Sequence, residues 1–102
     1  MIHPVIQSKM EDIRYLMRVH KIQKGYLFGS GVAERFTENS DVDVLVEIDE
    51  TIDPIELGGH LWDLQFGLEK LLGRKVDLLA SRSLRNPYLK ESINESKQLI
   101  YG

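Results

Sequence analysis

Hydrophobic and polar residues alternate along this chain with two periods, one typical of helices and the other typical of strands. The helical period begins near Pro4, and apolar side chains recur at helical spacing from Val5 to Met17, with His20 continuing the same spacing. Proline is tolerated in the first turn of a helix because its missing N–H group would have no partner there. The pattern therefore predicts a first helix over residues 4–20.

Two short apolar segments have the pattern of buried strands. Residues 26–28 form an apolar run between Gly25 and Gly29, and residues 76–79 form another run that contains Asp77. Short apolar runs bounded by turn-forming residues are typical of strands inside a sheet. We therefore predict a strand over each of these segments.

Residues 41–48 show the clearest strand pattern. Every even position holds a β-branched apolar residue, and the odd positions hold Asp41, Asp43, Leu45 and Glu47. Because successive side chains of a strand point to opposite faces, one face is continuously apolar and the other carries both aspartates. Taken alone, such a pair also fits an exposed edge or a turn cap. Its position inside a strand makes it a candidate for function.

A long helix is predicted over residues 54–72. Asp53 suits the N-cap, Pro54 suits the first helical position, and Gly73 suits the position after the last turn. Leucines at helical spacing form a stripe that should face the core: Leu57, Leu61, Leu64, Leu68 and Leu71.

Trp62 and Phe66 form a second apolar pair beside this stripe, four residues apart. We interpret both rings as core side chains, the commoner role of aromatic residues at helical spacing. The alternative is that a helix with apolar residues on more than one side meets a partner. The basic residues near the end of this helix are interpreted as solvated: Lys70, Arg74 and Lys75.

A final helix is predicted over residues 87–98, with an inner side formed by Leu89, Ile93 and Ser96. The segment 30–36 is long enough for a short helix between the first two strands. The elements then follow in the order αβαβαβα, an α/β (α+β) fold with a small mixed β-sheet and flanking helices. Residues 1–102 make a single domain, because two separate cores would each be too small.

Composition limits the classes of function. Hydrophobic residues are 42% and charged residues 28%, as in folded globular proteins, so disorder is excluded as a description of the whole chain. The chain has no cysteine, which excludes disulfides, thiol catalysis and cysteine-bound zinc. The net charge of −3 gives no strong nucleic-acid footprint. No apolar run suits a membrane span and no secretory signal is present, so a cytoplasmic location is expected.

Polar residues from three segments can meet at one edge of the sheet. If the first two strands are antiparallel neighbours, Gly29 and Ser30 lie beside the two aspartates of the second strand. A short helix beginning at Ser30 would present free N–H groups to a triphosphate. Mg²⁺ favours carboxylate oxygens as ligands. The carboxylates of Asp41, Asp43 and Asp77 would hold two such ions at this edge. Like charges held together oppose folding, so a metal-dependent function explains the cluster better than folding does.

These motifs make the chain resemble a known family. Gly29-Ser30, ten further residues and then Asp41-Val42-Asp43 resemble the signature of the nucleotidyltransferase superfamily that includes DNA polymerase β. The small size and the segments 73–79 and 87–102 are similar to the minimal nucleotidyltransferase (MNT) proteins. The resemblance implies roles for five residues: Asp41, Asp43 and Asp77 as catalytic metal ligands, and Gly29 and Ser30 as contacts of the nucleotide phosphates.

The chain departs from the family pattern at two positions. The family commonly has Gly-Ser-x-Ala-Arg-Gly, whereas this chain has Ala33 in place of the arginine and Glu34 in place of the glycine. Arg35 lies about 200° further round a helix, so it does not take the place of the missing arginine. The change removes a positive charge and adds a negative one near the proposed phosphate site.

The resemblance implies an enzyme that uses Mg²⁺ and transfers AMP from ATP to a hydroxyl group. The usual companion of MNT proteins is a HEPN-domain ribonuclease toxin, which implies an antitoxin that modifies a tyrosine of that toxin. Two alternatives stay open: a degenerate antitoxin that neutralises by contact alone, and a subunit of an antibiotic-modifying nucleotidyltransferase. Because the chain is too small to hold its own acceptor-binding domain, a partner subunit is expected, and a homo-oligomer is also compatible with the sequence.

Overall fold

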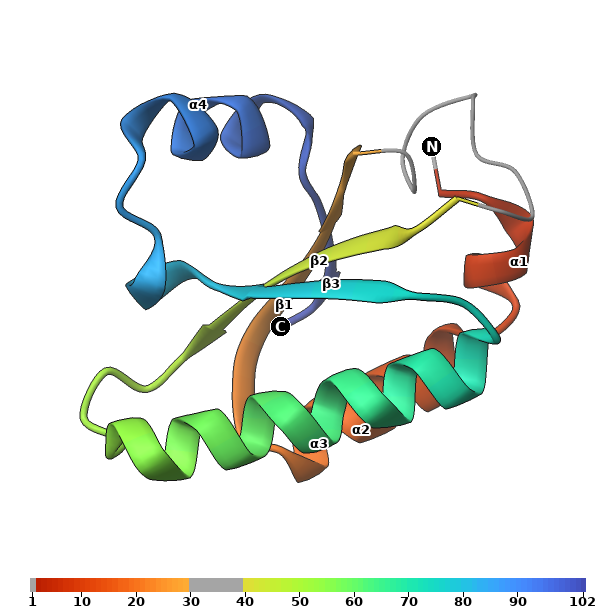
Figure 1. The fold of residues 1–102 in the computed structure, drawn as a ribbon. Coiled ribbons are helices and arrows are strands. Elements are labelled where there is room, and N and C mark those ends of the chain that lie inside the picture. Colours follow the sequence, from red (N-terminus) through yellow and green to blue (C-terminus); the bar gives the residue numbers. More distant parts are fainter. Residues whose placement is uncertain (1, 30–39) are drawn as a thin grey trace.

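The computed structural model describes residues 2–29 and 40–102, which form a four-stranded sheet with helices on both of its faces (Figure 1). The strand order is β3-β2-β1-β4. The helices are α1 (Pro4–Gln7), α2 (Met10–Val19), α3 (Pro54–Leu72) and α4 (Pro87–Ser96), with a short 3-10 helix η2 (Ser81–Ser83). The strands are β1 (Ile22–Phe28), β2 (Val42–Ile48), β3 (Val76–Ala80) and β4 (Gln98–Tyr101).

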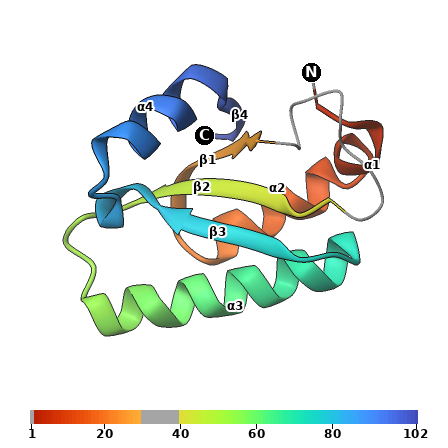
Figure 2. The ribbon, with the colours of Figure 1, turned by 45° about the horizontal axis from the view of Figure 1, so that its top comes forward.

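The sheet is mixed, and the predicted fold class is confirmed. β1 runs antiparallel to both of its neighbours, β2 and β4, and the first of these pairs meets the condition on which the predicted position of Gly29 beside the aspartates depends. β2 and β3 run parallel and are connected through α3. Figure 2 shows α2 and α3 on one face of the sheet and α4 on the other.

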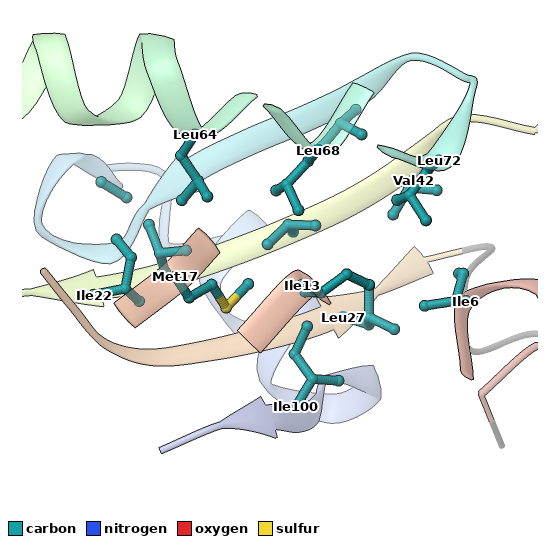
Figure 3. Close-up of a cluster of buried hydrophobic side chains, with 14 of the residues drawn as sticks. Ile6, Ile13, Met17, Ile22, Leu27, Val42, Leu64, Leu68, Leu72 and Ile100 are labelled. Atoms are coloured by element: carbon teal, nitrogen blue, oxygen red, sulfur yellow. The ribbon is translucent and has the colours of Figure 1, made fainter. Parts of the chain in front are cut away.

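The core lies between the sheet and the pair of helices α2 and α3. The β-branched row of β2 faces these helices and is buried, as its alternation predicts. Figure 3 shows side chains of α2, Ile13 and Met17, gathered with Leu64 and Leu68 of α3 against the strands. On the other face of the sheet, beneath α4, Leu45 and Ile93 are buried apart from this cluster.

The predicted single helix over residues 4–20 is wrong, because the structure has two helices with a break at Ser8 and Lys9. The Ser8 hydroxyl donates to the carbonyl oxygen of Val5 at 2.9 Å, and such local side-chain bonds compete with helix propagation. The Lys9 N–H turns to the carbonyl of Ile6 at 3.0 Å, an i to i−3 bond that tightens the chain. The break lets Ile6 and the inner side of α2 both reach the core.

The predicted start of the first strand at residue 26 is also wrong, because β1 begins four residues earlier at Ile22. Gly25 does not end the pattern. A Cβ atom at this position would overlap the sulfur of Met17 and lie 2.8 Å from its Cε. Gly25 therefore lies inside the strand, where the absence of a side chain lets α2 pack closely on β1.

The long helix is confirmed at both ends. The Asp53 carboxylate accepts a hydrogen bond from the N–H of Ile55 at 2.9 Å, and Pro54 opens the helix. Gly73 ends it with φ of 66°, and its N–H donates to the carbonyl of Glu69 at 2.8 Å. Within residues 2–29 and 40–102, no helix is both long and apolar enough to cross a membrane.

The predicted final helix over 87–98 is partly wrong, because α4 ends at Ser96 and residues 98–101 form β4. Ile93 is buried as expected, whereas Leu89 and Ser96 are exposed. The strand arises from pairing with β1, in which Leu99 lies opposite Tyr26. A segment of four residues gives too short an alternation for sequence inspection to separate it from a helix end.

Candidate active site

The parallel pairing of β2 and β3 places two of the candidate carboxylates side by side. Asp43 and Asp77 are direct register partners, and their side chains point to the same face of the sheet. The antiparallel pairing with β1 places Phe28 opposite Asp43, so Gly29 follows at the same edge. Asp41 lies two residues before Asp43, at the start of β2, and is exposed. The sheet thus places four of the five predicted site residues, Gly29 and the three aspartates, at one edge.

The neighbouring carboxylates act electrostatically on Asp43. Partial burial, followed by the charge and hydrogen bond of Asp77 and the charge of Asp41, raises the pKa of Asp43 above its ordinary value. A carboxyl group in this position resists ionisation because nearby negative charges oppose a further one. A cation bound between the aspartates would remove that opposition.

Gly29 is held in a conformation that other residues adopt only at a cost. Its φ is 66°, in the left-handed region. A Cβ atom at Gly29 would overlap the Oδ2 atom of Asp43 and lie 3.3 Å from its Cγ. The backbone at the end of β1 therefore passes directly against the carboxylate of β2. Its proposed contact with a nucleotide phosphate stays a prediction.

Ser30, the fifth predicted site residue, lies outside the described residues. So do the predicted short helix over 30–36 and the two departures from the family pattern, Ala33 and Glu34.

Two basic residues belong to this edge, and the prediction that they are solvated is wrong for Arg74. Arg74 is partly buried, and its Nη1 donates to the carbonyl of Ser40 at 3.3 Å, one residue before Asp41. The Nζ of Lys75 lies 3.8 Å from Oδ1 of Asp77, and both side chains are substantially exposed. The sequence feature that points to a place for Arg74 and Lys75 at this edge is their position immediately before the strand that carries Asp77.

The donor set suits a hard divalent cation. Carboxylate oxygens are the ligands that Mg²⁺ favours, and the crowding of Asp43 by Asp77 and Asp41 is the electrostatic situation that a cation relieves. In the part of the chain that the structure describes, no three carboxylate or imidazole side chains converge as a ready-made metal site. The chemistry of the aspartates fits Mg²⁺, and their role as metal ligands stays a proposal.

Comparison with known sequences gives the family. Residues 11–102 match the family model described as polymerase beta, nucleotidyltransferase. A protein of Methanocaldococcus jannaschii is 39% identical over 100 residues, which cover 90% of this chain and 96% of that protein. The protein adenylyltransferase MntA of Thermococcus cleftensis is 31% identical over 94 residues, covering 84% of this chain and 91% of MntA.

Solved structures have the same fold. One chain of a crystal structure of a toxin-antitoxin with AMP-PNP is 30% identical, with a TM-score of 0.74, covering 91% of this chain and 73% of that one. A chain from the complex of the tri-AMPylated Shewanella oneidensis HEPN toxin with MNT antitoxin is 28% identical, with a TM-score of 0.68. That match covers 94% of this chain and 71% of the other. From its sequence, its sheet and the position of its carboxylates, this chain belongs to the polymerase beta nucleotidyltransferase family and is an enzyme of the minimal nucleotidyltransferase type.

Proposed function

We propose that this chain is a protein adenylyltransferase that transfers AMP from ATP to a hydroxyl group of a HEPN-type toxin and so acts as its antitoxin. The observation that carries the proposal is the direct register of Asp43 and Asp77 at the edge of a nucleotidyltransferase sheet. The relatives add support, since they include the adenylyltransferase MntA and an antitoxin in complex with an AMPylated HEPN toxin.

Each site residue has a proposed task. Asp41, Asp43 and Asp77 would hold Mg²⁺, which when bound supplies positive charge to the attacking and leaving oxygens of phosphoryl transfer. Gly29 keeps the backbone close to Asp43 without a side chain, which leaves the edge open for the ATP phosphates. Ser30 is proposed to donate a hydrogen bond to the same phosphates.

The proposed transfer exchanges one oxygen on the α-phosphorus of ATP for another. The acceptor oxygen forms a bond to the α-phosphorus of ATP, and the bond from that phosphorus to the oxygen bridging toward the β-phosphate breaks. Pyrophosphate leaves, and Asp77 takes the proton of the acceptor hydroxyl. We propose a tyrosine as the acceptor, because a phenol ionises far more readily than an aliphatic hydroxyl.

The test is to incubate this chain with its HEPN-type toxin, ATP and Mg²⁺ and to measure the intact mass of the toxin. The toxin should gain the mass of one or more AMP groups and stay inactive after the two proteins are separated. Asp43→Asn should prevent the gain in mass. Asp63→Asn, an exposed aspartate of α3, serves as the matched control and should leave the gain unchanged.

A second candidate, neutralisation by contact alone, is favoured by Ala33 and Glu34, which depart from the family's arginine and glycine. It predicts a toxin of unchanged mass that regains ribonuclease activity on separation. Asp77→Asn distinguishes the two functions. Under the enzymatic proposal this variant binds the toxin and leaves its mass unchanged, whereas under the contact proposal it neutralises as well as the parent chain.

A further inference from the structure

The helix α3 has a second apolar face on the side away from the core. Ile55, Trp62 and Phe66 are 86%, 75% and 65% exposed. At about 100° per residue, these three side chains lie within roughly 40° of one another around the helix. The buried leucines of α3 lie on the opposite side. The interpretation of Trp62 and Phe66 as core side chains is therefore wrong, and the alternative of a partner-facing surface gains support.

Two glycines share this exposed face. Gly58 and Gly59 lie between Ile55 and Trp62, and apart from the adjacent residues and the backbone of α3 itself, no described atom comes within 4 Å of a Cβ added at either position. Glycine is the least favourable helix residue after proline, so two in succession weaken the helix. Packing among the described residues gives no reason for them. The face thus lacks side chains at Gly58 and Gly59, a gap that we call the hollow, and the rings of Trp62 and Phe66 are exposed toward its C-terminal end.

We propose that this face binds a second copy of the chain, with the two α3 helices antiparallel around a two-fold axis near residues 62 and 63. With a rise of 1.5 Å per residue, Phe66 and Gly59 lie at equal distances of about 5 Å on either side of that axis. The two-fold operation therefore places each Phe66 over the Gly58-Gly59 hollow of the other copy, and the two Trp62 rings meet near the axis. A self-complementary face of this kind is what a symmetric dimer requires, because both copies present the same patch.

Asp63 is exposed beside the two-fold axis, so the two copies bring like charges to one rim of the interface, which weakens association. The other charged residues near the face are compatible with this packing. Glu56 pairs with Lys21 of its own chain at 3.9 Å, and Glu69 accepts the N–H of Val76 at 3.0 Å. In the antiparallel arrangement Lys70 lies opposite Ile55 of the other copy, where its aliphatic stem can cover the apolar side chain. The few large side chains involved make a small interface, so we expect a micromolar dissociation constant.

Dimer formation through this face needs neither nucleotide nor toxin, so it is tested on the chain alone. Trp62 is the only tryptophan of the chain, and its ring reports directly on the proposed contact. Its fluorescence emission should shift to the blue as concentration rises from low to high micromolar. Over the same range, sedimentation equilibrium should show conversion from monomer to dimer. A chain that stays monomeric at every concentration would overturn the proposal.

Two variants locate the contact. Phe66→Ser removes the protruding ring and should weaken association at least tenfold. Gly59→Leu fills the hollow and should weaken association as strongly, while raising the melting temperature of the dilute monomer because leucine favours helix. Tyr88→Ser is the matched control, since Tyr88 is an aromatic residue of α4 that is 82% exposed, and it should leave association unchanged. If the Phe66 and Gly59 variants dimerise like the parent chain, the interface lies elsewhere and the proposal fails.

Discussion

Asp43 of β2 and Asp77 of β3 lie directly opposite each other in a parallel strand pair, and Asp77 makes the ionised state of Asp43 less favourable. Because the two residues are register partners on one face of the sheet, they cannot move apart without breaking the backbone hydrogen bonds between β2 and β3. The sheet therefore holds two carboxylates together at a cost to folding. Their proposed use as ligands of a divalent cation explains why the chain keeps such an arrangement.

The first prediction concerns the charge of Asp43. Because the pKa of Asp43 is raised in the folded chain, the folded state at neutral pH carries a penalty that the unfolded state lacks. Asp43→Asn should therefore be more stable than the parent at pH 7, by about 0.5 kcal/mol, since solvent screens a half-buried carboxyl group. Urea unfolding of both chains measures the difference.

The pH dependence of that difference supplies the control. The penalty on the folded state is absent below the pKa of the unfolded aspartate. It grows as pH rises from there and is complete above the raised pKa of Asp43 in the folded chain. The advantage of Asp43→Asn should accordingly shrink as pH falls from 7 toward 3.5. A variant that is strongly destabilised at pH 7 would show instead that Asp43 has a structural role.

The second prediction concerns Mg²⁺. A cation that binds only the folded site stabilises the chain by mass action, by about 1.4 kcal/mol at ten times its dissociation constant. Thermal unfolding in rising Mg²⁺ should show this increase in melting temperature for the parent chain. The double variant Asp41→Asn/Asp43→Asn should show none. Equal responses of the two chains would count against the aspartates as ligands.

The third prediction compares two glycines with the same backbone conformation. Gly29 and Gly73 both have φ of 66°, but of these two glycines only Gly29 has a described side chain in the path of a new Cβ, that of Asp43. Gly73→Ala should lose about 1–2 kcal/mol of stability, the cost of the left-handed conformation alone. Gly29→Ala should lose more, because it also displaces Asp43. Chemical denaturation of both variants measures the two losses.

A double-mutant cycle isolates the contact between Gly29 and Asp43. In an Asp43→Ala background the overlapping carboxylate is gone, so Gly29→Ala should cost little more than Gly73→Ala does. If the extra cost of Gly29→Ala is the same in both backgrounds, it does not come from Asp43.

The fourth prediction concerns Lys75, whose ammonium group lies beside Asp77. An exposed pair of this kind contributes at most about 1 kcal/mol, so Lys75→Met should change the unfolding free energy little. If Lys75 competes with a cation for Asp77, its removal should tighten Mg²⁺ binding about two- to fivefold. Calorimetric titration with Mg²⁺ measures the change, and Lys70→Met is the control. Weaker binding by Lys75→Met would show that the lysine does not compete.

The sequence by itself determined the features that depend on neighbouring residues. The bounds of α3 follow from the cap at Asp53, the proline after it and Gly73, all of which act within one helical turn. The buried face of β2 follows from strict alternation in residues 42–48. The signature from Gly29 to Asp43 indicated the family, and Asp77 was already a candidate ligand as the carboxylate inside the next predicted strand.

Tertiary structure decided the features that depend on residues far apart in the chain. The register of Asp43 with Asp77 arises only when α3 returns the chain to lie parallel beside β2. β4 forms because β1 offers a free edge to a segment with little strand signal of its own. Gly25 is a site of close packing rather than a break, because Met17 of another element covers it. Trp62 and Phe66 point outward because the leucine stripe already fills the core side of α3, and helical periodicity cannot tell which of two apolar faces the sheet will cover.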